Sequence, residues 1–183
     1  MLTKAGLRVY SRGECSLRPP RGDFDRQGAI TFATIHHGGP VGGPRMTKAH
    51  AITTWRGWQA YHQGANGWDD IGYHFGVDGL GRLYAGRPPW AIPAAVGGHN
   101  TGSVGIVFMQ DGRYHALNIA QRRTLRVLFD RGLPELGVPP LLKLARDPRS
   151  SYGVFGHNEF AEHRTNECPG PKIMATLRKE RAR

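Results

Sequence analysis

Two histidines lie next to each other at the end of an apolar run, in "TIHHGG" (residues 34–39). Two more residues with metal-binding side chains, His157 and Cys168, also lie where a strand-like or loop-like run meets a helix-like run. Zinc accepts imidazole nitrogen and thiolate sulfur together, and a catalytic zinc takes three protein ligands and leaves the fourth position to water. One histidine of the pair, His157 and Cys168 would supply such a set. Because adjacent strand residues point to opposite faces, at most one of His36 and His37 can face the site.

The spacing of these residues is not by itself diagnostic of zinc. Their intervals match no compact finger motif, and the chain has no pair of closely spaced cysteines, which a structural zinc finger needs. The chain has nine histidines, and we interpret His50, His62 and His115 as surface residues. The second cysteine, Cys15, lies in a run rich in Arg, Gly and Pro and is interpreted as incidental.

The elements that must position these side chains alternate between strands and helices. The strand-like runs are residues 30–36, a hairpin over 71–88, residues 102–109 and residues 154–160. The helix-like runs are 47–63, beginning at Thr47, then 119–131, with a capping box formed by Asn118 and Gln121, and a last helix opened by proline in 169–183. Strands interleaved with helices predict an α/β fold: a single domain with a central mixed β-sheet flanked by α-helices.

The remaining segments are predicted to be less regular. Residues 1–29 indicate an irregular N-terminal arm before a domain at 30–183, and a Pro-rich connection covers 134–153. The spacing of Trp55, Trp58 and Tyr61 on the first helix indicates core packing.

Composition narrows the class of protein. The 183 residues favour one domain with a full hydrophobic core. No run approaches the roughly 20 apolar residues of a membrane span, and the first residues are too polar for a secretory signal, so we expect synthesis in the cytoplasm. The formal net charge of +11 at pH 7 favours polyanionic surroundings such as nucleic acid, acidic lipid or an anionic cell wall.

Four blocks occur in this order: "IHH", "GWDDIGYHFGVDGLGRLYAGRP", "GGHNTGSVGIVFM" and "FGHNEF…ECPG". With them the chain resembles the zinc-dependent N-acetylmuramoyl-L-alanine amidases of the type-2 amidase and peptidoglycan recognition protein superfamily, which includes phage endolysins. The resemblance covers about residues 30–175. It implies a zinc amidase catalytic domain at 30–183 that cleaves the amide between N-acetylmuramic acid and L-alanine with zinc-activated water. A short basic chain without a signal peptide is most similar to the phage lytic members, which act on the bacterial cell wall.

The resemblance implies roles for individual residues. His36, the first of the pair, is the first zinc ligand, and His157 and Cys168 are the others. Tyr73 corresponds to the catalytic tyrosine near the zinc-bound water. Asn166 stands two residues before the cysteine, where relatives commonly have Lys or Thr to polarise the substrate carbonyl, and an asparagine amide can donate a hydrogen bond there without the charge.

A second histidine competes for one ligand position. His163 lies between His157 and Cys168, in an interval longer than relatives usually have. We prefer His157 because "FGH" matches the family context, whereas "AEHRTN" is interpreted as an inserted loop.

The resemblance also implies peptidoglycan as the partner. The expected substrate contacts are His99, Asn100, His37, Trp68 and Arg87. General attraction of the positive charge to an anionic wall would hold the enzyme near its substrate, and we expect a monomer.

Two other functions compete with the amidase. One is a recognition module that binds peptidoglycan without cutting it; Cys168 argues against it and Asn166 favours it. The other is a nuclease, because "GHNEFAEH" has a superficial similarity to His-Asn-His motifs and the charge would suit DNA. A nuclease does not explain the "GYHF" and "ECPG" blocks, so we expect no nucleic-acid partner.

Overall fold

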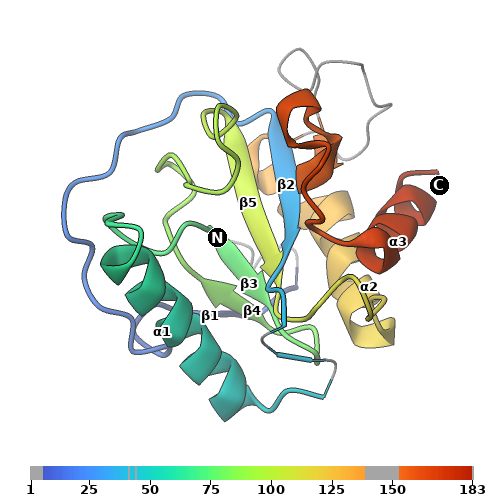
Figure 1. Cartoon of the computed structure of the whole chain (residues 1–183), viewed down its shortest axis with the longest axis horizontal. Coiled ribbons are helices and arrows are strands. Elements are labelled where there is room, and N and C mark those ends of the chain that lie inside the picture. Colours follow the sequence, from blue (N-terminus) through green and yellow to red (C-terminus); the bar gives the residue numbers. More distant parts are fainter. Residues whose placement is uncertain (1–5, 41, 44, 139–152, 183) are drawn as a thin grey trace.

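A six-stranded mixed sheet forms the centre of the molecule, in the strand order β1-β4-β3-β5-β2-β6 (Figure 1). The computed structural model describes residues 6–40, 42–43, 45–138 and 153–182. The strands are β1 (Val9–Tyr10), β2 (Phe32–His37), β3 (Phe75–Val77), β4 (Leu83–Ala85), β5 (Ser103–Phe108) and β6 (Gly153–Gly156). Strand β2 runs parallel to both β5 and β6, whereas β3 and β4 form an antiparallel hairpin. The predicted α/β class with a mixed sheet is therefore confirmed.

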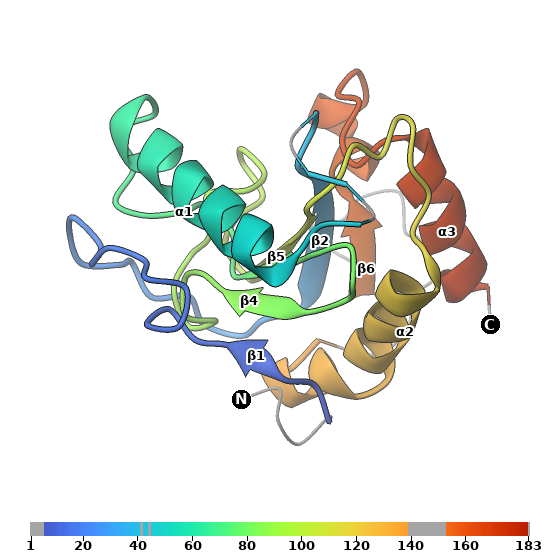
Figure 2. The ribbon, with the colours of Figure 1, turned by 90° about the horizontal axis from the view of Figure 1, so that it is seen from below.

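Helices cover both faces of the sheet. They are α1 (Lys48–Gly64), α2 (Ile119–Val127) and α3 (Pro171–Arg181). Helix α1 lies on one side of the sheet, and α2 and α3 lie on the other (Figure 2). None of the described helices is long and apolar enough to span a membrane.

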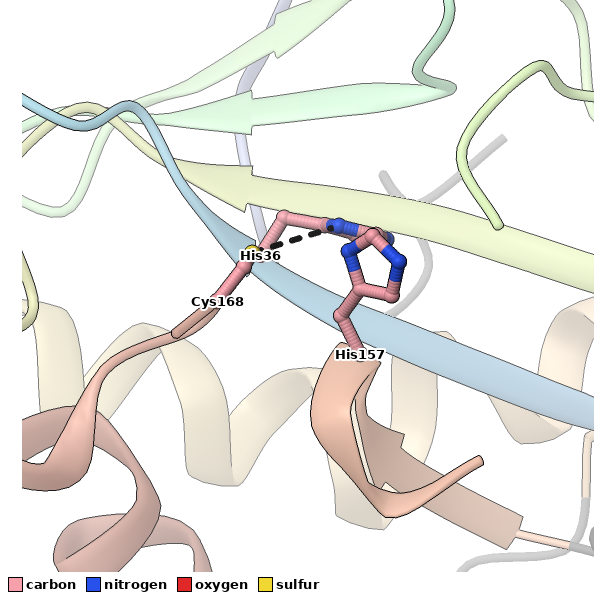
Figure 3. A group of neighbouring side chains, drawn as sticks. All are labelled: His36, His157 and Cys168. Atoms are coloured by element: carbon pink, nitrogen blue, oxygen red, sulfur yellow. Dashed lines mark hydrogen bonds between the residues drawn. The ribbon is translucent and has the colours of Figure 1, made fainter. Parts of the chain in front are cut away.

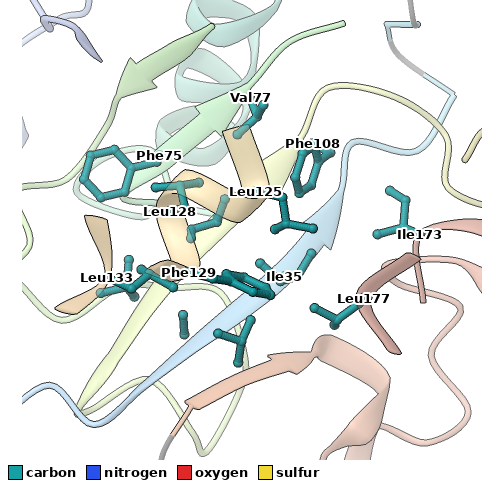
Figure 4. Close-up of a cluster of buried hydrophobic side chains, with 14 of the residues drawn as sticks. Ile35, Phe75, Val77, Phe108, Leu125, Leu128, Phe129, Leu133, Ile173 and Leu177 are labelled. Atoms are coloured by element: carbon teal, nitrogen blue, oxygen red, sulfur yellow. The ribbon is translucent and has the colours of Figure 1, made fainter. Parts of the chain in front are cut away.

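The alternation of side chains along the strands divides the core into two parts. On β5, Ile106 and Phe108 join a cluster with residues of α2 and α3 (Figure 4), whereas Val107 joins a smaller cluster with Trp55 of α1. The larger cluster includes Ile35, Leu125, Phe129, Ile173 and Leu177. Both faces of the central strands are consequently buried, which is typical of parallel strands between helices.

Local signals at helix ends were predicted correctly. The side chain of Thr47 caps α1 by accepting a hydrogen bond from the His50 N–H (3.2 Å), and Asn118 and Gln121 form the expected reciprocal capping box. The second helix has the predicted extent, because the chain is helical from Ile119 to Gly132. It is α-helical only as far as Val127, and its last turn, Leu128–Gly132, is π-helical.

The last strand is shorter than predicted. Strand β6 ends at Gly156, and the chain turns at once into a 3-10 helix, His157–Glu159. The Pro-rich connection at 134–153 falls largely outside the described residues, although Pro134–Leu136 forms a 3-10 turn.

The N-terminal arm is less irregular than predicted. Strand β1 pairs with β4 in a parallel arrangement, and Cys15 is fully buried among α1-side core residues. Arg12 donates a hydrogen bond to the buried carboxylate of Asp70 (2.6 Å). These contacts fasten the arm to the domain.

One core prediction on α1 was wrong. Trp55 is fully buried and Trp58 packs beside it, but Tyr61 is 60% exposed. The reason is that Tyr61 lies on the face of α1 that borders a groove instead of the sheet.

Candidate metal centre

Three predicted ligands converge at one edge of the sheet (Figure 3). One ligand atom from each of His36, His157 and Cys168 lies within 4.8 Å of the others. His36 is near the carboxyl end of β2, and His157 directly follows its parallel neighbour β6, so both side chains reach the same edge. Cys168 comes from the loop before α3, and its Sγ lies 3.5 Å from Nδ1 of His36.

The two adjacent histidines have different surroundings. The His36 side chain enters the cluster and is 1% exposed. His37 turns its ring away, where Nδ1 accepts a hydrogen bond from the Gly112 N–H (3.0 Å), while its backbone N–H donates to Sγ of Cys168 (3.4 Å). His37 is thus a neighbour that hydrogen-bonds beside the site.

His163, the competing residue, lies at the border of the cluster. Its ring centroid is 4.9 Å from that of His157, but its Nε2 is hydrogen-bonded to the backbone oxygen of Gly97 (2.9 Å). Within the described residues it is not part of the group whose ligand atoms converge. The geometry favours His157 as the third ligand.

Burial sets the protonation of the cluster. It lowers the pKa of His36 well below the usual value and, together with nearby His163, lowers the pKa of His157 to about 4. Burial also raises the pKa of the Cys168 thiol to about 12, against the opposing effect of the His37 N–H. Both imidazoles are therefore neutral at pH 7, and a thiolate at this place requires a cation beside it.

The donor set fits zinc. Two imidazoles and one thiolate are ligands that zinc accepts, and three protein ligands leave a position open. Nε2 of His157 is buried and has no hydrogen-bond partner among the described residues, which is unusual for a neutral polar atom in a protein interior. A metal held by these three residues would give this nitrogen a partner for its lone pair.

Tyr73 lies beside the cluster. Its ring centroid is 5.2 Å from that of His36, and it directly precedes His74 and strand β3. Burial and the proximity of Cys168 raise the pKa of its phenol well above the usual value. The side chain is therefore a neutral hydroxyl at pH 7 and can donate a hydrogen bond.

A groove of about 410 Å³ lies between α1 and two residues that neighbour His36, namely His37 and Tyr73. It is lined by His37, Gly38, Trp58, Tyr61, His62 and Tyr73. Glycine is required at position 38 because a Cβ there would collide with the ring of Trp58. Most of the lining side chains are aromatic, and Tyr73 among them contacts the ring of His36.

His62 was predicted to be a surface residue, and this prediction was wrong. It is 8% exposed, and its Nδ1 accepts a hydrogen bond from the Gly72 N–H (3.1 Å). Its ring packs against Trp68, with centroids 4.8 Å apart. The spacing of Trp58 and His62, four residues apart on one helix, was the available signal that both face the same groove.

Two predicted substrate contacts make hydrogen bonds within the protein. Oδ1 of Asn100 accepts from the backbone N–H groups of Ala95 and Val96 (2.9 Å each). Arg87 is 8% exposed and donates to two backbone carbonyl oxygens (2.8 Å each). Both side chains stabilise loops near the site.

Two other predicted residues also have partners. Nε2 of His99 lies 2.9 Å from a carboxylate oxygen of Glu162, which connects the loop before β5 to the loop before Cys168. Asn166 is exposed, and its Oδ1 accepts a hydrogen bond from the Cys168 N–H (2.8 Å). Asn166 therefore shapes the turn that presents the cysteine.

Comparison with known sequences shows the family of this chain. The profile of the N-acetylmuramoyl-L-alanine amidase family (Amidase_2) matches residues 26–171. Peptidoglycan-recognition protein LB of Drosophila melanogaster is 31% identical over 173 residues, covering 94% of this chain and 68% of that protein. Human N-acetylmuramoyl-L-alanine amidase is 31% identical over 149 residues, covering 81% of this chain and 24% of that protein.

A solved structure gives the same relationship. A tyrosine-to-phenylalanine mutant of Drosophila PGRP-LB, in complex with the monomeric diaminopimelic acid-type peptidoglycan called tracheal cytotoxin, superposes with a TM-score of 0.76. The two chains are 30% identical, and the match covers 94% of this chain and 95% of the other.

Proposed function

The chain belongs to the N-acetylmuramoyl-L-alanine amidase family, and from this premise we propose that it is a zinc-dependent peptidoglycan hydrolase. The bond cleaved is the amide between N-acetylmuramic acid and L-alanine. The observation that carries the proposal is the convergence of His36, His157 and Cys168 beside an aromatic groove.

The residues of the site divide the chemical work. His36, His157 and Cys168 would hold zinc, which supplies a Lewis acid for the scissile carbonyl and makes water a nucleophile at neutral pH. The Tyr73 hydroxyl donates a hydrogen bond to the carbonyl oxygen as negative charge develops on that atom. Its raised pKa makes it a hydrogen-bond donor at neutral pH and a poor proton acceptor.

The groove orients the substrate. Because Nδ1 of His62 accepts from a backbone N–H, the proton of the neutral ring lies on Nε2, which remains a donor for a substrate oxygen. The rings of Trp58 and Tyr61 offer apolar surface to the sugar or the peptide. His37 borders the same groove and completes the wall nearest the metal ligands.

A recognition module without catalysis is the second candidate. Relatives named as recognition proteins support it, and so does Asn166 at the position where the family commonly has Lys or Thr. The retained Cys168, with its sulfur directed at His36, favours the enzyme.

The biological setting is also a proposal. The phage lytic role and action from the host cytoplasm rest on the size and charge of the chain, because the relatives reported above are animal proteins. A monomer suffices, since one chain supplies all three ligands. The net charge of +11 would attract the protein to an anionic wall.

Mass spectrometry of muropeptides tests the proposal. Purified peptidoglycan is digested by the protein with zinc, with a chelator, and after zinc is restored. We expect stem peptides with a free L-alanine amino group and glycan with a free lactyl carboxyl group, formed only with zinc. Binding to peptidoglycan without these products would identify a recognition module.

A further inference from the structure

A buried threonine contacts His36, the first predicted zinc ligand, at the ring nitrogen that does not face Cys168. Thr34 Oγ1 lies 3.1 Å from Nε2 of His36. The two residues are separated by one position on β2, so their side chains lie on the same face of the strand. We propose that Thr34 is a positioning residue that fixes the orientation and the tautomer of His36 for metal binding. This inference rests on the proposed function.

The geometry assigns different tasks to the two nitrogens of the ring. Nδ1 is directed at Sγ of Cys168 (3.5 Å) and therefore faces the metal cluster (Figure 3). A neutral imidazole that binds a metal through one nitrogen carries its proton on the other. The proton of His36 must then be on Nε2, where Thr34 Oγ1 is the acceptor.

Burial makes this acceptor necessary. Thr34 is 0% exposed and His36 is 1% exposed, so solvent does not replace the hydroxyl. Without the Thr34 hydroxyl, the Nε2–H of His36 in the metal-bound protein would be buried without an acceptor, which is unfavourable. Residues that orient a ligating histidine through its second nitrogen typically change metal affinity by about 10- to 100-fold when mutated.

The opposite polarity has a distinct consequence. If the Thr34 hydroxyl donated to Nε2, the ring proton would lie on Nδ1, between the ring and Cys168. That tautomer would block ligation through Nδ1. Zinc binding and the acceptor role of Thr34 therefore require each other.

Two substitutions separate the hydroxyl from the shape of the side chain. Thr34→Val removes the hydroxyl at nearly constant volume, and Thr34→Ser keeps it. Zinc affinity is measured by competition with a chromophoric chelator, and the absorption spectrum of the cobalt(II) form reports the ligand geometry. Thr124→Val is the control, because it removes another buried threonine hydroxyl, which bonds the Gly81 carbonyl on the far side of the sheet.

We expect Thr34→Val to bind zinc about 10- to 100-fold more weakly and to change the cobalt spectrum. Thr34→Ser should retain affinity near that of the wild type, and Thr124→Val should retain both affinity and spectrum. Wild-type affinity and spectrum in folded Thr34→Val would overturn the inference, and so would equal weakening in the Val and Ser variants.

A measurement on the unaltered protein does not depend on the variants folding. Two-bond ¹H–¹⁵N NMR correlations identify the tautomer of His36 in the zinc-loaded wild type. We expect the proton on Nε2, and a proton on Nδ1 would overturn the inference. A wild-type protein that cleaves peptidoglycan yet shows that result refutes only the role of Thr34, whereas one that takes up no zinc refutes the proposed function as well.

Discussion

The backbone N–H of His37 donates a hydrogen bond to Sγ of Cys168 across 3.4 Å, although 131 positions separate the two residues in the sequence. This contact favours the thiolate, whereas burial favours the thiol. The donor belongs to the backbone, so this contribution to the sulfur environment comes from the position of β2 and not from the His37 side chain. Strand β2 thus carries one predicted ligand, His36, and hydrogen-bonds another, Cys168.

Replacement of Cys168 by Ser should abolish both zinc binding and hydrolysis. A serine hydroxyl is a much poorer zinc ligand than a thiolate at neutral pH. Metal analysis of the purified variant and muropeptide release measure the two effects. Cys15→Ala is the matched control, because Cys15 is buried in the α1-side core, and it should retain stoichiometric zinc. Stoichiometric zinc in Cys168→Ser would contradict the ligand assignment.

Replacement of Tyr73 by Phe should slow hydrolysis by about 10²–10³-fold while zinc content is unchanged. Only the donor hydroxyl is lost, and the ring that packs near His36 remains. Turnover of soluble muropeptides and metal analysis provide the two readouts. Tyr10→Phe, whose ring stacks on Tyr84 in β4, is the control. Equal turnover in the Tyr73 variant and the wild type would exclude the proposed donor role.

Arg12→Ala should lower the free energy of unfolding by about 3–5 kcal/mol. The substitution leaves the carboxylate of Asp70, which is fully buried, without its charged partner. Arg8→Ala removes the exposed ion pair with Glu14, which solvent screens, and should leave stability nearly unchanged. Urea denaturation of both variants compares the two pairs. Similar small losses would mean that the arm is not fastened by Arg12.

Acid should destabilise the protein through His74. Its Nδ1 accepts from the Gly105 N–H, its Nε2 contacts the Ala91 oxygen, and burial lowers its pKa to about 4. The imidazole of His74 is protonated near pH 6.5 in the unfolded chain but only near pH 4 in the folded protein. The free energy of unfolding therefore keeps its full value above pH 6.5 and decreases as the pH falls from 6.5 to about 4. The full loss from this histidine is about 3 kcal/mol.

Urea denaturation from about pH 7.5 to about pH 4 measures this slope. In His74→Gln the loss of stability over the same pH range should be smaller than in the wild type. His50→Gln, on the exposed side of α1, reports the effect of removing a histidine from the surface. A slope in His74→Gln equal to that of the wild type would show that His74 does not couple stability to pH.

Lysis of intact walls should decrease as salt increases. Attraction between the charge of +11 and an anionic wall is screened within about 8 Å at physiological ionic strength. Turbidity assays over a range of sodium chloride concentrations provide the measurement, with a small neutral muropeptide as the control substrate. Equal salt dependence for both substrates would locate the effect in the site and not in attraction to the wall.

Features encoded by neighbouring residues were predictable. The N-cap at Thr47 and the capping box at Asn118 depend on contacts within one helical turn, and the buried strands follow from local apolar runs. The four ordered blocks also identified His36, His157 and Cys168 as the candidate ligands. None of these inferences required the positions of distant segments.

The sequence by itself determined the order of the main elements from residue 30 onward, the chemical types at the site and the family to which they belong, but it did not reveal strand β1 in the N-terminal arm. Only the tertiary structure decided which polar side chains already have partners: Asn100 and Arg87 bind backbone groups, His62 lies in the groove, and Thr34 contacts His36. The physical reason is that burial and hydrogen bonding depend on which segments meet across the sheet. Local periodicity specifies the face of a strand or helix, but the fold alone determines what that face contacts.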